Sequence, residues 1–203
     1  MTGKNDRSIT IMDLYCVSPE IKPTIIVKLK TSTETTAYAN DVDYCVKVLH
    51  AYQNLCLLIK ERKGRNINFP EIISELLVKL IIQKIERIQV TGNCSGDLQT
   101  YPDRIPLQVK CWSSTGPISF GPLTKWERLY LLDATKYRQL LFKCYRVNVS
   151  SDDQKYLSLK VSTTESVQQQ SEKMRRPRIQ PLSLLQQLGS SVIFNGHIND
   201  LLL

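Results

Sequence analysis

The sequence is poor in the side chains on which several common kinds of active site depend. Only two histidines occur among its 203 residues, so Ser-His-Asp triads and histidine-metal nuclease centres find little support. The six cysteines are scattered without Cys-X-X-Cys spacing, which argues against a zinc ribbon and favours reduced core thiols in a cytosolic setting. Aromatic residues make up 7% of the chain and give no repeated stacking platform.

Long apolar runs are also missing. No run of about 18 apolar residues and no signal peptide is present, so membrane spanning and secretion are disfavoured and we expect a cytoplasmic protein. The net charge of +8 suits a polyanionic partner. With 42% hydrophobic residues and no long linker, the chain is expected to form one globular domain over residues 1–203.

The most informative segment, residues 96–110, predicts a β-hairpin. Residues 101–104, Tyr-Pro-Asp-Arg, suit a type I turn with Pro and Asp at its two central positions. Counting outward from that turn places Asp97 opposite Gln108, and Lys110 points to the same face. A longer loop or a bulge would shift this register by one residue.

These three side chains suit hydrolysis of a phosphodiester. Asp97 and the Gln108 oxygen are the kind of ligands that Mg²⁺ prefers, and Lys110 can orient the nucleophile or stabilise the transition state. The alternative is an ordinary surface hairpin with a cross-strand ion pair between Lys110 and Asp97.

An Asp, ten intervening residues and then Gln-Val-Lys resembles the core of the PD-(D/E)XK nuclease superfamily, the restriction-endonuclease-like fold. The departure is Gln108, because most members carry Asp or Glu there. The resemblance implies a Mg²⁺-dependent endodeoxyribonuclease of type II restriction type, with Asp97, Gln108 and Lys110 as catalytic residues. The literal Pro102-Asp103 is assigned to the turn and not to the first acid of the motif.

Upstream, residues 68–87 have Ile and Leu at helical spacing after Pro70 and predict a helix. Ile73-Ser74-Glu75 is similar to the context in which the family often carries a further metal-binding Glu. Glu75 is therefore expected to complete the catalytic and metal-binding set with Asp97 and Gln108. The alternative is a solvent-exposed pair of Glu75 with Lys79.

The flanking segments complete the expected core. A capping box formed by Thr124 and Glu127 predicts a helix over 124–137. With strands at 85–90 and 139–149 and the hairpin between them, the order is αβββαβ, the order of the family core. The fold class is therefore α/β (α+β), with a mixed central sheet flanked by helices. Outside the core we expect a helix over 41–62, a strand over 156–161, a helix over 181–188 and a strand over 191–194.

Two segments are candidates for DNA contact. The small-residue loop 113–122 offers hydroxyls to phosphates, and the basic segment 173–179 offers cations to phosphates or to guanine edges. Both segments are equally compatible with plain connectors. The DNA-binding candidates are Ser113, Ser114, Ser119, Lys173, Arg175, Arg176 and Arg178.

Taken with the resemblance, the domain divides into helical support (1–66), catalytic core (67–150) and DNA-contact or dimer elements (151–203). The implied partners are double-stranded DNA and a second copy of the chain. A cognate methyltransferase is expected in the same system, without a stable complex. The alternatives are a non-catalytic DNA-binding protein on the same scaffold and a repair or junction-resolving nuclease.

Overall fold

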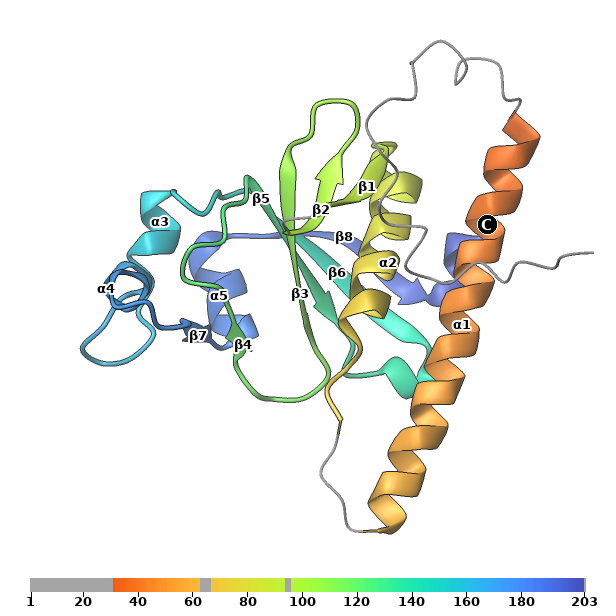
Figure 1. Cartoon of the computed structure of the whole chain (residues 1–203), viewed down its shortest axis with the longest axis horizontal. Helices are drawn as coiled ribbons and strands as arrows, with labels where there is room; N and C mark the ends of the chain where they lie inside the picture. The colour runs from red at the N-terminus through yellow and green to blue at the C-terminus, as the bar shows by residue number, and fades with distance from the viewer. Residues whose placement is uncertain (1–30, 63–66, 94–95, 203) are drawn as a thin grey trace, which may run out of the picture.

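The computed structural model describes residues 31–62, 67–93 and 96–202. At its centre lies a six-stranded mixed sheet in the order β1-β2-β3-β5-β6-β8 (Figure 1). β3 and β5 are parallel, and every other neighbouring pair is antiparallel. The strands are β1 (Val90–Asn93), β2 (Gly96–Thr100), β3 (Pro106–Trp112), β5 (Arg128–Asp133), β6 (Leu141–Val147) and β8 (Ser191–His197). The predicted mixed α/β class is confirmed, and the sheet is compatible with a restriction-endonuclease-like core.

The strand β5 occupies a segment that the sequence predicted as a helix over 124–137, so that prediction is wrong. Leu129 to Leu132 are all fully buried, as expected of a strand covered on both faces. The Glu127 backbone N–H that a capping box would have used binds elsewhere, as does the neighbouring Trp126 N–H. Trp126 donates to Ser151 Oγ, and Glu127 donates to Pro106 O at 3.0 Å. The connection 113–127 contains only the two-residue strand β4 (Ile118–Ser119).

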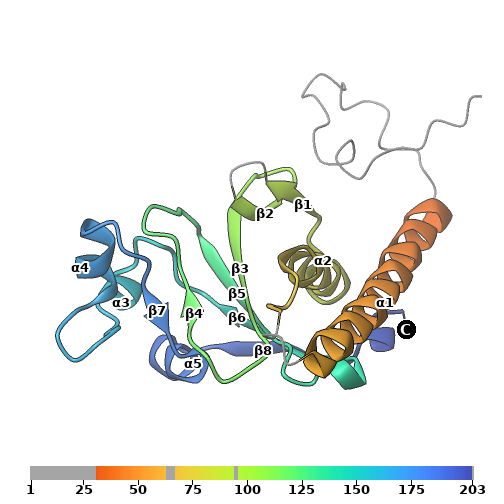
Figure 2. The same ribbon diagram turned by 60° about the horizontal axis from the view of Figure 1, so that its bottom comes forward.

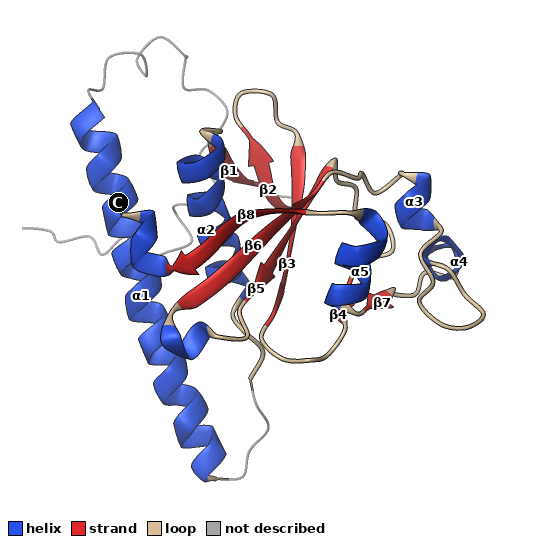
Figure 3. Cartoon of the chain, turned by 180° about the vertical axis from the view of Figure 1, so that it is seen from behind, coloured by secondary structure: helices blue, strands red, loops and turns tan. Residues whose placement is uncertain are grey.

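Two helices cover one face of the sheet (Figure 3). They are α1 (Thr31–Glu61) and α2 (Glu71–Ile81), and α2 continues into the short π-helix η3 (Ile82–Glu86). Leu49, Ile73 and Leu77 from these helices pack with Tyr130 and Leu132 of the sheet. Both predicted helices are confirmed, although α1 begins ten residues before the expected start at residue 41. Within the described residues, no helix has the length and apolar character needed to cross a bilayer.

The predicted first strand over 85–90 is displaced. Residues 85 and 86 end the helix, and Arg87 follows in the left-handed conformation with φ of 59°, so the strand begins only at Val90. The end of the helix is tied to the sheet by the Glu86 carboxylate. It accepts hydrogen bonds of 2.8 Å from Tyr130 Oη and from Arg146 Nη1.

The other face carries the segment between β6 and β8 and a second sheet (Figure 2). In this small sheet, β4 pairs with β7 (Arg178–Ile179). Phe120, Trp126, Leu131 and Leu184 form the core beneath it. The helices on this side are α3 (Gln154–Leu157), α4 (Val167–Glu172) and α5 (Pro181–Leu188).

The expected helix over 181–188 is confirmed, and the last strand extends beyond its predicted end to His197. The predicted strand over 156–161 is wrong. The Asp153 carboxylate caps α3 by accepting from Lys155 N–H, and Tyr156 and Leu159 are buried at helical spacing.

Smaller features complete the fold. The 3₁₀ helices are η4 (Tyr137–Gln139) and η5 (Ile198–Leu201), and Leu201 is buried. The cysteines within the described residues are free thiols, at Cys45, Cys56, Cys111 and Cys144.

Leu131→Ala should lower the free energy of unfolding by about 2–5 kcal/mol, because it opens a cavity in a strand buried on both faces. Leu123→Ala is the matched control, since Leu123 is 68% exposed and should change stability by about 0.5 kcal/mol or less. Urea unfolding measures both variants. Equal effects of the two substitutions would contradict the central position of β5.

Candidate active site

The hairpin formed by β2 and β3 has the predicted register. Leu98 pairs with Leu107 and Gln99 with Pro106, so Asp97 lies opposite Gln108. The connection is a loop over residues 101–104 and not the expected two-residue turn. Thr100 closes it, because its carbonyl accepts from Arg104 N–H and its hydroxyl accepts from Ile105 N–H, each at 3.0 Å. Since Thr100 also pairs with Ile105, the longer loop leaves the register unchanged.

The Asp97 carboxylate is held by the neighbouring strand. Its Oδ2 atom accepts a hydrogen bond from Gln108 Nε2 and one of 2.7 Å from Val109 N–H. Gln108 Nε2 also lies 3.4 Å from the Val109 carbonyl, and its side chain is 3% exposed. Asp97 is therefore anchored by the Gln108 side chain and the Val109 backbone. An ordinary surface hairpin, the alternative considered from the sequence, would instead have paired Asp97 with Lys110.

The candidate catalytic side chains line one cleft of about 500 Å³ between α2, β3 and the segment that follows β3. Glu75 enters it from α2, while Asp97, Gln108 and Lys110 enter from the hairpin. Three predicted hydroxyl contacts and one predicted cation also line it, namely Ser113, Ser114, Ser119 and Arg176. Residues distant in the sequence therefore share one cavity, as the catalytic prediction requires.

Negative charge is concentrated in this cleft. Burial, with smaller contributions from the nearby Asp97 and Glu71, raises the pKa of Glu75 to about 7 against the opposing effect of Lys110. Burial also raises the pKa of Asp97, although Lys110 and the hydrogen bonds from Val109 and Gln108 lower it. The protein's own cations therefore leave these carboxylates incompletely compensated.

The remaining contacts bear on the alternatives considered for Glu75 and Lys110, which were ion pairs at the protein surface. Lys79 Nζ lies 4.0 Å from Asp41, and the alternative pairing of Glu75 with Lys79 is not found among the described residues. Lys110 Nζ lies 5.9 Å from the centroid of the Phe120 ring, next to the residues of β4 that line the cleft. Lys110 thus remains available for a ligand in the cleft.

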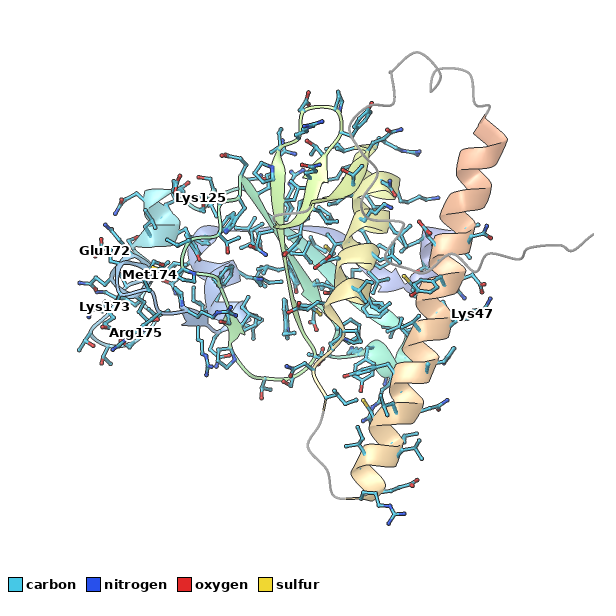
Figure 4. All side chains as sticks on the ribbon, in the orientation of Figure 1. Lys47, Lys125, Glu172, Lys173, Met174 and Arg175 are labelled. Atoms are coloured by element: carbon cyan, nitrogen blue, oxygen red, sulfur yellow. The ribbon has the colours of Figure 1, made fainter. Side chains whose placement is uncertain are left out.

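The other predicted DNA-binding cations lie elsewhere. Lys173 and Arg175 approach Glu165, with N–O distances of 2.6 and 4.0 Å, and Arg178 lies on β7. Figure 4 labels Lys173 and Arg175 at the end of the molecule that is far from α1. Glu71 also lines the cleft, although it was not among the residues predicted from the sequence. Its spacing of four residues from Glu75 on one helix face was the available signal.

The donor set suits a hard cation that keeps part of its water. Among the described residues, no three His, Cys, Asp or Glu side chains form a chelating group by themselves. The oxygen atoms of Asp97, Glu75 and Gln108, together with water, could serve as ligands for a cation in this cleft, which is compatible with Mg²⁺.

Comparisons with known proteins relate the chain to restriction endonucleases. The model of the Bsp6I restriction endonuclease family matches residues 38–188, which include all the side chains named in the cleft. The type II restriction enzyme Bsp6I of Bacillus sp. (strain RFL6) is 28% identical over 142 residues, which are 69% of this chain and 78% of that enzyme. No solved structure matches the chain.

The raised pKa of Glu75 predicts a pH effect on stability in the metal-free protein. The folded protein binds this proton more tightly than the unfolded chain, so the stabilisation is complete below the ordinary pKa of 4.5 and is lost as the pH rises through about 7. In Glu75→Gln, the free energy of unfolding should therefore fall less over this pH range, as measured by urea unfolding in EDTA. Glu127→Gln, at an exposed position, should follow the wild type. If the free energy of unfolding changed with pH in the same way for wild type and Glu75→Gln, the raised pKa of Glu75 would be contradicted.

Proposed function

Because the chain belongs to the Bsp6I restriction endonuclease family and is an endonuclease of restriction type, we propose that it hydrolyses double-stranded DNA with Mg²⁺ as cofactor. The proposed core is the PD-(D/E)XK type in its Gln-X-Lys variant. The observation that carries the proposal is the pairing of Asp97 with Gln108 in the cleft that Lys110 and Glu75 also line.

We assign Asp97, Gln108 and Glu75 as the residues that would hold the metal. The Gln108 amide nitrogen faces the Asp97 carboxylate and the Val109 carbonyl, so its oxygen is the atom left to offer a cation. The raised pKa values of Glu75 and Asp97 support a cation here, because a divalent ion would compensate their charge. When bound, Mg²⁺ supplies the charge that stabilises phosphoryl oxygens and makes water a stronger nucleophile.

The protein side chains have distinct roles in this proposal. Lys110 donates from Nζ to the attacking water and to the phosphoryl oxygens, where negative charge grows in the transition state. Asp97 stays oriented because the backbone N–H of Val109 and the amide of Gln108 hold the same oxygen. Preorganisation of this kind reduces the reorganisation needed during the reaction.

The DNA backbone would lie along the rim of the cleft. Ser113, Ser114 and Ser119 line it and can donate hydroxyl hydrogen bonds to phosphates. Arg176 adds a cation to the same cavity, whereas Lys173 and Arg175 are engaged by Glu165. Arg176 is therefore a better candidate for DNA contact than those two residues.

The wider proposal keeps the organisation expected from the sequence. One domain would hold helical support (1–66, of which 1–30 and 63–66 lie outside the described residues), core (67–150) and DNA-contact elements (151–203), in an intracellular setting without a stable methyltransferase complex. A repair or junction-resolving nuclease could use the same metal site, but the family match favours the restriction type. The same match disfavours a non-catalytic DNA-binding protein.

We also propose a homodimer, which would bring one active site to each DNA strand. The support comes from an apolar stripe on α1 that lies beside the face packed on the core. Its members recur at alternating spacings of four and three residues, the pattern of helix pairing: Tyr44, Val48, Ala51, Leu55 and Leu58. Leu55 and Leu58 are 47% and 59% exposed, and the end of α1 projects past the sheet (Figure 1). An antiparallel partner helix would bring Lys47 of each copy near Glu61 of the other.

Lys110→Ala should reduce Mg²⁺-dependent cleavage of plasmid or phage DNA by on the order of 100-fold or more, because a donor to the transition state is lost. DNA binding measured with Ca²⁺ should be largely retained. Lys125→Ala is the control, since Lys125 pairs with Asp152 outside the cleft and should leave the discrete cleavage bands unchanged. Failure of the wild-type protein to cut DNA at any Mg²⁺ concentration would overturn the proposed function, and cleavage by Lys110→Ala at the wild-type rate would overturn the role of Lys110.

The dimer surface has its own test by sedimentation equilibrium. Leu55→Glu combined with Leu58→Glu should weaken the dimer at least about 10-fold, since two charges would enter an apolar interface. Leu57→Glu should leave it intact, because Leu57 is also exposed, at 53%, but points away from the stripe. A monomeric wild type, or equal weakening by Leu57→Glu, would exclude this surface.

A further inference from the structure

The basic segment between α4 and α5 is divided by its contacts into two pairs. Lys173 Nζ lies 2.6 Å from Glu165 Oε1, and Arg175 Nη1 lies 4.0 Å from Glu165 Oε2. Gln170 Nε2 donates to the same carboxylate at 3.1 Å. Glu165 therefore draws two of the four cations into an intramolecular cluster that fixes the end of α4.

The second pair, Arg176 and Arg178, has different surroundings. Both side chains are exposed, and within the described residues neither has an ion pair or a side-chain hydrogen bond. Arg176 lines the cleft that contains Asp97 and Lys110. Both guanidinium groups thus lack a partner within the described residues, and that of Arg176 lies in the cleft of the proposed reaction site.

The strand pair β4–β7 fixes where these two guanidinium groups lie. Ile118 pairs with Ile179 and Ser119 pairs with Arg178. Both isoleucines are buried, at 6% and 3% exposure, so the alternating direction of side chains turns Ser119 and Arg178 away from that core. Ser119 itself lines the cleft.

The backbone on either side reinforces this placement. Phe120 N–H donates to the Pro177 carbonyl at 3.0 Å. This bond ties Pro177, which lies between the two arginines, to the residue that directly follows β4. Pro177 and Phe120 are both buried. Arg176 and Arg178 therefore stand two residues apart on an anchored ribbon.

A ribbon of two strands fits the major groove of B-form DNA, and a guanidinium group matches the O6 and N7 acceptors of guanine with two parallel hydrogen bonds. Lysine offers a point charge without this planar geometry. We propose that Arg176 and Arg178 bind guanine edges close to the cleaved phosphodiester and so determine which DNA sequence the enzyme recognises. This proposal rests on the proposed function.

The test uses Arg176→Lys and Arg178→Lys, which keep the charge and remove the planar fork. Wild type and variants are incubated with a randomised duplex library, and bound duplexes are selected with Ca²⁺ and sequenced. Wild type should select guanine at defined positions. Each variant should lose roughly 5- to 150-fold of the discrimination at one such position, while its affinity for non-specific DNA and the salt dependence of that affinity stay close to wild type.

Arg175→Lys is the matched control, because the Arg175 guanidinium group of the wild type lies at Glu165. The sequence preference of this variant should equal that of the wild type. Thermal unfolding confirms that each variant is folded. Unchanged preferences in both Arg176→Lys and Arg178→Lys, or wild-type selection without guanine, would overturn the inference. Since selection is by binding and needs no cleavage, a catalytically inactive protein would contradict the proposed function and leave this result interpretable.

Discussion

The hydrogen bond from the Gln108 amide to the Asp97 carboxylate connects β2 and β3 in the cleft. The candidate site depends on the register of these two strands, which places Asp97 opposite Gln108. A slip of one residue would turn Gln108 and Lys110 to the opposite face of the sheet, because side chains alternate along a strand. The same register leaves Val109 N–H directed at Asp97. Glu75 joins the site only because Leu77 and Ile73 pack α2 onto this sheet.

The neutral side chain of Gln108 is consistent with the charge balance of the cleft. Burial and the neighbouring Asp97 and Glu71 already raise the pKa of Glu75 to about 7, so a fourth carboxylate in place of Gln108 would add repulsion in the metal-free protein. Gln108 instead donates a hydrogen bond to Asp97 and keeps an oxygen for a ligand. A Gln at this position therefore adds no further negative charge to the cleft, and under the proposed function its oxygen is kept for the metal.

The sequence was sufficient where local rules decide the outcome. The hairpin register follows from counting along two strands, and α2 follows from Pro70 and its apolar spacing. It was insufficient at residues 124–137, where a short apolar run fits a helix or a strand and the Glu127 N–H bond to Pro106 decides. The engagement of Lys173 by Glu165 was equally hidden, because it is a tertiary contact of exposed charges. Propensity carries no information about such pairings.

The most direct test of this account is calorimetric titration of Mg²⁺ into the protein without DNA, for wild type and Asp97→Asn. The substitution keeps the shape of the side chain and removes the charge on which the proposed metal site depends. The account predicts that the wild type binds Mg²⁺ and that Asp97→Asn weakens binding by about 10-fold or more while both proteins remain folded. Equal Mg²⁺ affinity in the two proteins would contradict it.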